Sequence, residues 1–313
     1  MTAPAALRCA GLTRCFGSIT AIDRVSLTVP QGTVLALVGA NGAGKSTLLH
    51  LMLGLQAPTN GTIDVFGQAV HRDNQRQQDR ISYLSDDDSV DRGLRVQQFA
   101  NYRGAINRRF DRACFDALAK RAGIRHEQRI GDLSRGQRTS LLIAAAIAND
   151  PELLILDDPT VGLDASARRD VIEAIIATAR RPGRTVIFST HQVEDIDRVA
   201  DRLAILDRGT LIADASLDEF RSAIRRTLLR FPSPPPQPGP GVLAWHVEGD
   251  VVEAITVIPD GDIDRWATSC GASSVQPLPL NLDAALTAYL TPHRTPLSTV
   301  IDQLPPTHTK NIP

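Results

Sequence analysis

Short runs of apolar residues alternate with longer stretches of helical periodicity through the first part of the chain. Three of these runs, at residues 33–38 (TVLALV), 153–156 (LLIL) and 185–188 (TVIF), are apolar at nearly every position. Unbroken apolar runs of this length are typical of strands that helices cover on both faces, as in a mostly parallel sheet. The pattern therefore predicts an α/β core that extends to about residue 224.

A more polar stretch interrupts the core at about residues 86–140. It is rich in Arg, Gln and Asp and carries helical patterns such as the one at residues 111–121. We interpret it as a helical subdomain of the domain at residues 1–224. The alternative is a long solvated insertion.

Proline marks the clearest boundary in the chain. Residues 231–241 read FPSPPPQPGPG, and proline sustains neither a helix nor a central strand, so we predict a linker at residues 225–241. Beyond it, residues 242–290 contain two strand-like pieces and two short helical patterns, which indicates a small α+β accessory domain. The polar, aperiodic tail at residues 291–313 is predicted to be disordered.

Composition and charge exclude several classes of protein. The 313 residues include 34 Lys and Arg against 35 Asp and Glu, a net charge of -1, so no global positive field favours nucleic acid. The four cysteines lack the spacing of a metal site, and we expect them to be reduced. No window approaches eighteen consecutive apolar residues, so a protein of this kind that acts at a membrane needs a partner to hold it there.

Residues 39–47 read GANGAGKST and match the phosphate-binding pattern G-x-x-x-x-G-K-[ST], directly after one predicted strand and before a helical run. Its glycines let backbone N–H groups turn toward phosphates, its lysine neutralises the terminal phosphates and its serine offers a hydroxyl to Mg²⁺. The alternative is a plain turn before a helix, although lysine is otherwise found only at Lys120 and Lys310. The predicted nucleotide-binding residues of this loop are Gly39, Asn41, Gly42, Gly44, Lys45, Ser46 and Thr47.

Two acids follow the second apolar run, in the segment LLILDDPTVGLD at residues 153–164. Asp157 is suited to bind Mg²⁺ together with Ser46, and Asp158 is placed to face the attacking water. Adjacent carboxylates at a strand end also serve as helix caps, which is the alternative for this pair.

The order of the motifs resembles the nucleotide-binding domains of ABC transporters. The segment LSRGQ at residues 133–137 lies shortly before LLILDDP, and VGLD and STH (residues 189–191) follow it. The resemblance covers roughly residues 5–225. It implies a P-loop NTPase fold of the ABC ATPase type with a helical subdomain, followed here by the small α+β domain, and it implies ATP and Mg²⁺ as cofactors.

The resemblance also implies roles for single residues. ATP is expected between the 39–47 loop of one subunit and the signature segment of another, in a homodimer or pseudo-dimer. His191 is expected at the γ-phosphate and the attacking water, with a buried structural histidine as the alternative. Phe16 holds the place of the aromatic that stacks on adenine, with a core phenylalanine as the alternative. The signature and D-loop residues implied are Ser134, Gly136, Gln137 and Asp164.

Two residues depart from the family pattern. Asp158 stands where most active members have glutamate, one methylene longer, so we expect slow hydrolysis. Asp86 stands where a glutamine usually senses the metal and the membrane partner, and we assign it roles in nucleotide and Mg²⁺ binding. A solvated acidic loop is the alternative.

The function expected from the resemblance is that of an ATP-hydrolysing subunit that powers export through separate integral-membrane permease subunits, on the cytoplasmic face of the membrane. One alternative is a soluble ABC ATPase that acts outside transport. Another is a regulatory clamp that binds ATP and hydrolyses it slowly. We expect no nucleic-acid partner, and the sequence does not reveal the cargo.

Overall fold

The computed structural model describes residues 4–70, 74–85, 90–232, 234–239, 241–257 and 263–291. The chain divides into two compact units, Met1–Leu211 and Ile212–Pro313. No helix within the described ranges is long and apolar enough to cross a membrane.

The centre of the first unit is a sheet with strand order β10-β9-β3-β8-β7-β6. The pairs β3/β8, β3/β9, β7/β8 and β6/β7 are parallel. The three predicted strands are confirmed as β3, β7 and β8, and every residue in them is buried. The bounds are β3 Val34–Val38, β6 Ile81–Leu84, β7 Leu153–Leu156, β8 Thr185–Thr190, β9 Arg202–Asp207 and β10 Thr210–Ser216.

A second sheet, of order β2-β1-β4-β5, is antiparallel. Its strands are β1 Ala5–Phe16, β2 Ile19–Pro30, β4 Asn60–Val65 and β5 Gln68–Ala69. Apolar residues from this sheet, such as Leu7 and Val29, share one buried cluster with Leu35 of β3 and with helix α1. The second sheet is thereby fixed beside the loop that follows β3.

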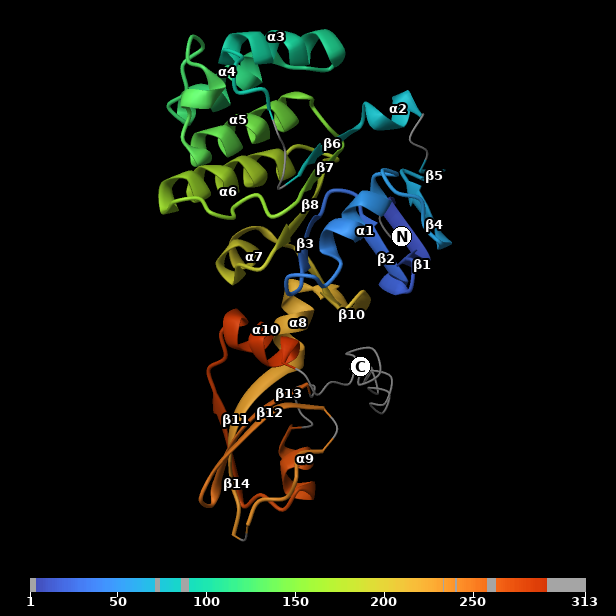
Figure 1. Ribbon diagram of the computed structural model, residues 1–313. Coiled ribbons are helices and arrows are strands. Elements are labelled where there is room, and N and C mark those ends of the chain that lie inside the picture. Colours follow the sequence, from blue (N-terminus) through green and yellow to red (C-terminus); the bar gives the residue numbers. More distant parts are fainter. Residues whose placement is uncertain are drawn as a thin grey trace, which may run out of the picture. The chain divides into compact units, whose positions relative to one another are not determined.

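Helices α3 to α6 lie on the side of strands β6, β7 and β8 that is opposite the second sheet (Figure 1). Val96, Phe115 and Leu141 belong to their common apolar cluster, which is distinct from the cluster around β3. The helices and the 3-10 turn of the unit are α1 Lys45–Met52, α2 Gln75–Gln78, α3 Val96–Ile106, α4 Arg112–Arg121, η1 Ile130–Asp132, α5 Arg135–Ala148, α6 Ala165–Ala179 and α7 Val193–Val199.

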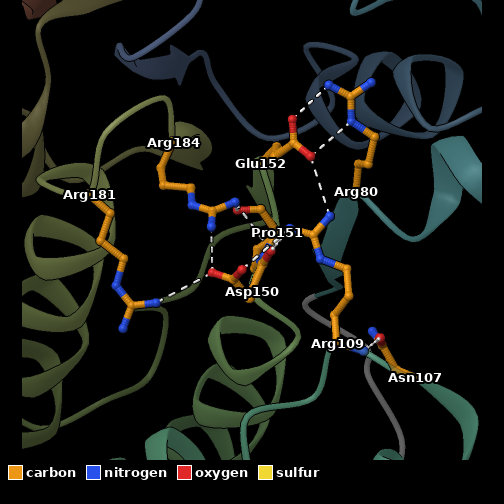
Figure 2. Close-up of polar contacts among 8 residues, drawn as sticks. All are labelled: Arg80, Asn107, Arg109, Asp150, Pro151, Glu152, Arg181 and Arg184. Carbon is orange, nitrogen blue, oxygen red and sulfur yellow. Dashed lines mark hydrogen bonds and ion pairs between the residues drawn. The ribbon is translucent and has the colours of Figure 1, made fainter.

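The amino-terminal end of β7 carries a network of ion pairs, which we call the arginine cluster (Figure 2). Glu152 accepts two hydrogen bonds from Arg80, at 3.0 and 2.6 Å. Asp150 pairs with the guanidinium groups of Arg109, Arg181 and Arg184. These residues come from four separate segments of the chain, so the cluster fastens the α3–α4 loop and the end of α6 to the base of the sheet.

The second unit contains an antiparallel sheet of order β12-β13-β11-β14. Leu229, Val252 and Ala267 form its apolar cluster, against which Trp245 and Trp266 pack. The elements are α8 Leu217–Ala223, β11 Ile224–Arg230, β12 Val242–Glu248, β13 Val251–Val257, α9 Ile263–Ser269, β14 Ser274–Leu278 and α10 Leu282–Leu290.

The second unit begins earlier than the predicted boundary at residue 224. Phe220 of α8 packs edge-on against Tyr289 of α10, and the Tyr289 hydroxyl donates to the Ile212 carbonyl at 2.9 Å. The assignment of residues 225–230 to the linker is wrong, because they form β11, with Thr227 and Leu229 buried. The described residues of 231–241 belong to no helix or strand. The predicted disordered tail lies, from residue 292 on, outside the described residues.

Candidate functional site

Three adjacent strands bring the predicted site residues to one edge of the central sheet. The parallel register pairs Val38 with Thr190 and Leu156 with Phe188. The chain therefore leaves β3, β8 and β7 at the same edge, where Gly39, His191 and Asp157 follow in turn. Ligands of open α/β sheets bind at the carboxyl ends of the strands, so this edge is the candidate site.

The loop between β3 and α1 needs glycine at two positions. A Cβ atom on Gly39 would lie 2.4 Å from the Leu206 carbonyl oxygen, and one on Gly44 would lie 2.7 Å from the Ala21 carbonyl oxygen. Gly44 also has φ +104, which side-chain-bearing residues rarely adopt. The loop therefore keeps its curled shape only with glycine at these places.

Lys45 lies inside this curled loop. Its side chain is buried, and Nζ donates to the carbonyl oxygens of Gly39 at 3.0 Å and Ala40 at 3.4 Å. Within the described residues no carboxylate forms an ion pair with it. A buried ammonium held only by neutral carbonyls favours a bound anion, so this cradle fits a phosphate group.

Helix α1 starts at the same loop without a cap. Gly44 is the N-cap and provides no side-chain hydrogen bond, and the first turn contains no acidic residue. The N–H groups at a helix start carry partial positive charge, and among the described residues no side chain caps them here. Ser46 is exposed in this first turn, Thr47 is half-buried, and Asn41 and Gly42 are exposed in the loop before it.

The two acids after β7 differ in surroundings. Asp157 is buried, and its Oδ1 accepts a hydrogen bond from the Ser189 hydroxyl at 2.5 Å. Asp158 has φ +44, and its backbone N–H donates to the same Ser189 oxygen at 2.7 Å. Neither acid caps a helix, because Asp164 is the N-cap of the next helix, α6. The helix-cap alternative for the pair is thus wrong.

His191 lies beside Asp158. Its Nδ1 is 3.3 Å from Asp158 Oδ1, and its side chain is 46% exposed. The alternative of a buried structural histidine is therefore wrong. A cavity of about 310 Å³ lies next to Asp157 and Asp158, with Arg135 and Arg138 among its lining residues. Asp157 and Asp158 thus face a polar space that water can enter.

The signature segment begins helix α5. The Ser134 hydroxyl accepts from the Gln137 N–H at 3.1 Å, while the Gln137 side chain accepts from the Ser134 N–H at 3.1 Å, a reciprocal capping box. Gly136 faces α6: if it carried a Cβ atom, that atom would lie 3.0 Å from the Ala167 Cβ. Asp164 caps α6 through Oδ1, which accepts from Ser166 and Ala167.

The signature segment and the phosphate loop belong to different parts of the first unit. Helix α1 contacts β2 and β4, whereas α5 contacts α4, α6 and β6. In Figure 1 the two helices lie on opposite sides of the central strands.

Two further predicted residues lie differently in the structure. Phe16, at the end of β1, is 43% exposed and has the Arg14 guanidinium over its ring at 4.5 Å. The alternative of a core phenylalanine is therefore wrong. Asp86 lies outside the described residues.

Ser189 is the site residue that the sequence analysis missed. In the sequence it is only the first residue of STH, and a serine at the end of a buried apolar strand gives no sign of what it contacts. The one available signal is its position: the parallel register pairs Leu156 of β7 with Phe188 of β8, and Asp157 and Ser189 are the next residues of the two segments.

A buried network behind the site was also missed. The Thr160 hydroxyl donates to Asp195, which is 1% exposed, and Arg168 donates to the other oxygen of that carboxylate. This network ties the segment after the two acids to α6 and α7. No set of three or more His, Cys, Asp or Glu side chains within the described residues forms a metal site. A site built from a hydroxyl and a single carboxylate is instead the kind that Mg²⁺ shares with nucleotide phosphates.

Comparisons with known proteins agree with this geometry. The sequence pattern of the family described as ABC transporter matches residues 22–161. Nod factor export ATP-binding protein I of Rhizobium sp. (strain N33) is 34% identical over 216 residues, which cover 67% of this chain and 71% of that protein. The daunorubicin/doxorubicin resistance ATP-binding protein DrrA of Streptomyces peucetius is 34% identical over 233 residues, 72% of this chain and 70% of that protein.

A solved structure shares the fold. The dimeric post-hydrolysis state of the ATP-binding cassette MJ0796, bound to ADP and Pi, superposes with a TM-score of 0.58 at 23% identity and covers 67% of this chain and 98% of that one. The family match at residues 22–161 includes Lys45, Asp157 and Asp158. The expected fold, a P-loop ABC ATPase core, is thereby confirmed, and the chain belongs to the ATP-binding subunits of the ABC transporter family.

Proposed function

We propose that this chain hydrolyses ATP at the carboxyl edge of its central sheet and uses the energy to drive export through separate membrane subunits. The observation that carries the proposal is the buried Lys45 ammonium beside an uncapped helix start; within the part of the chain that the structure describes, it is held only by the carbonyls of its own loop. Two relatives support the direction of transport, since their names refer to Nod factor export and to drug resistance.

The phosphate groups of ATP would lie in the loop at residues 39–47. Gly39, Gly42 and Gly44 allow its shape, while Asn41 and Thr47 extend the polar surface. Lys45 would exchange its carbonyl acceptors for phosphate oxygens. The N–H groups at the start of α1 would be satisfied by the same oxygens. Phe16, exposed at the end of β1, is available to stack on the adenine.

Ser46 and Asp157 would hold Mg²⁺. Both offer oxygen ligands, and the buried, hydrogen-bonded carboxylate of Asp157 gains a compensating positive charge when the ion is present. The ion would supply charge neutralisation for the phosphate groups. Asp86 would provide a further contact to the metal and the nucleotide.

Asp158 and His191 would handle the attacking water. Asp158 would accept its proton, and His191, within reach of Asp158 and half exposed, would orient the γ-phosphate and the water. The positive φ of Asp158 sets the direction of its short side chain. This arrangement is compatible with turnover that is slow rather than absent.

The site would be completed by a second copy or a similar subunit. Because α1 and α5 contact different elements, Ser134, Gly136 and Gln137 would serve the nucleotide of the partner rather than that of their own chain. A hydroxyl both donates and accepts, so Ser134 can cap α5 and still donate to a phosphate oxygen. Asp164, beside this segment, would lie at the same interface. The dimeric form of the structurally similar cassette supports this assembly.

The membrane subunit would be a separate polytopic protein, and this chain would lie against its cytoplasmic side. The test is to purify the chain with the membrane protein encoded next to it, and to measure ATP hydrolysis and retention of a fluorescent ATP analogue. We expect co-purification, and we expect Lys45→Ala to lose nucleotide binding while Lys120→Ala, the matched control, retains it.

Three outcomes would contradict this function. Unchanged nucleotide affinity in Lys45→Ala would exclude the proposed cradle. ATP-induced dimerisation without any turnover would favour the regulatory clamp. Turnover that never depends on a membrane subunit, with no co-purifying membrane protein, would favour a soluble ATPase.

A further inference from the structure

We propose that Ser189 is a positioning residue for hydrolysis, because one buried hydroxyl aligns both Asp157 and Asp158. The inference rests on the proposed function, in which these two acids bind the metal and activate water. It concerns a residue to which neither the motifs nor the comparisons give a role.

The hydrogen-bond directions around Ser189 are determined by chemistry. Its Oγ lies 2.5 Å from Asp157 Oδ1 and 2.7 Å from the Asp158 nitrogen. The backbone N–H of Asp158 can only donate, so the hydroxyl accepts there. Its single hydrogen then goes to Asp157, whose ionised carboxylate can only accept. The orientation of the Ser189 hydroxyl is therefore fixed by one hydrogen bond that it donates and one that it accepts.

Burial makes these two hydrogen bonds consequential. Ser189 is 0% exposed and Asp157 is 3% exposed, so the hydrogen bond between them is shielded from water and its loss is costly. Removal of the hydroxyl would leave Asp157 Oδ1 and the Asp158 N–H without these partners. A charge-assisted hydrogen bond of this kind also fixes which oxygen of Asp157 points away from β8 and toward the site.

The second effect concerns the backbone of Asp158. Its φ of +44 lies in the left-handed region, which residues other than glycine rarely adopt. The hydrogen bond from its N–H to Ser189 holds the residue in that conformation. Since a misplacement of about 1 Å can cost about 10²-fold in rate, the direction of a short aspartate depends strongly on this contact.

The test uses two substitutions at Ser189 of β8 that have nearly the same shape and differ in the hydroxyl. Threonine keeps the hydroxyl and valine has nearly the same shape without it, and both are favourable in a buried strand. The experiment compares Ser189→Thr with Ser189→Val in the full chain. It measures kcat, KM for ATP and thermal unfolding. It also measures the affinity for Mn²⁺ in the presence of a non-hydrolysable ATP analogue, by electron paramagnetic resonance.

We expect Ser189→Val to lower kcat by about 10- to 100-fold with KM for ATP within about threefold. Its Mn²⁺ affinity should fall by about three- to tenfold, because the Asp157 oxygen is no longer held. Ser189→Thr should stay within about threefold of wild type in each measurement. If both bulkier side chains prevent folding, Ser189→Ala takes the place of valine, with the same expected losses.

Several outcomes would overturn the proposal. One is wild-type kcat and Mn²⁺ affinity in Ser189→Val; another is an equal loss in the threonine and valine variants, which would indicate crowding. Asp157→Asn serves as the reference for the proposed function. If Asp157→Asn loses Mn²⁺ affinity and Ser189→Val does not, only the role of Ser189 fails. If neither loses it, the assignment of Asp157 fails as well.

Discussion

Strand β7 carries a pair of acidic residues at each end, and the two pairs have opposite surroundings. At its amino-terminal end, Asp150 and Glu152 lie within the arginine cluster, whose four guanidinium groups pair with them (Figure 2). At its carboxyl-terminal end, Asp157 and Asp158 contact a serine and a histidine. Among the described residues, neither of these two acids forms an ion pair with lysine or arginine.

The different surroundings of the two acidic pairs distinguish carboxylates that stabilise the fold from carboxylates that are available for chemistry. A carboxylate that is already neutralised by arginine has little remaining affinity for a metal ion, and it contributes by fixing segments together. A buried carboxylate that has only hydrogen bonds still favours a cation. In the proposed function, one end of the strand would therefore stabilise the fold and the other would take part in the chemistry, according to the partner residues at each end. Four predictions test this comparison.

The largest effect is expected from Asp157→Asn. The amide keeps the shape and can still accept from Ser189, but it removes the charge, so turnover should fall by about 10²-fold or more. The melting temperature should stay within about 2 °C of wild type. Steady-state hydrolysis and thermal unfolding provide the two readouts. Asp150→Asn at the other end is the control, and an Asp157→Asn variant of normal activity would remove the basis of the comparison.

The next-largest effect is expected from a longer acidic side chain at the carboxyl-terminal end of β7. Asp158→Glu adds one methylene and should bring the carboxylate closer to the water, raising kcat by about tenfold if slow hydrolysis reflects the short side chain. Initial rates at saturating ATP, for both proteins in parallel, measure it. A slower glutamate variant would mean that the φ of +44 at Asp158 already places the shorter side chain correctly.

At the amino-terminal end the expected effect is on stability. Glu152→Gln removes the carboxylate that pairs with Arg80 and one of the two that pair with Arg109. The two arginine side chains are each 33% exposed, and the free energy of unfolding should fall by about 1–2 kcal/mol. Turnover should stay within about twofold. Urea denaturation of wild type and variant gives the difference. A variant of unchanged stability but impaired turnover would assign the arginine cluster to the chemistry instead.

The smallest effect is a dependence on pH. Hydrogen bonds from Arg80, and then from Arg109, lower the pKa of Glu152 below its ordinary value of 4.5. The carboxylate's contribution is therefore complete above pH 4.5 and is lost as the pH falls through the lower pKa of the folded state. The stability difference between wild type and Glu152→Gln should be constant near neutral pH and shrink below that value. Denaturation curves between neutral and acidic pH measure it, and a difference that grows on acidification contradicts it.

The parts of the fold that carry strong periodicity were predictable. The fully apolar strands β3, β7 and β8 and the loop after β3 follow from local pattern alone, since each signal lies within a few consecutive residues. Strands β1 and β2 were not predicted individually, because polar residues alternate through them and the bulges in their pairing disturb the alternation. Strand β14 contains Pro277, which weakens any strand prediction.

The contacts around the site were predictable only in part. The motifs supplied Lys45, Asp157 and His191, but the role of Ser189 depends on strand register, which no single segment of sequence contains. The arginine cluster is similarly hidden, because its residues come from loops separated by dozens of positions and each one alone resembles an ordinary surface charge. Contacts between distant segments are what pattern reasoning lacks.

The uncapped start of α1 connects nucleotide binding with the stability of this helix. With glycine at its N-cap and no acid in its first turn, this helix has no capping group of its own. A nucleotide bound as proposed would supply the missing acceptors, so the triphosphate would act as the last structural component of the first unit. Cells that run short of ATP would then hold this subunit in a form whose first helical turn opens more readily, exposing the loop to proteolysis before the rest of the chain.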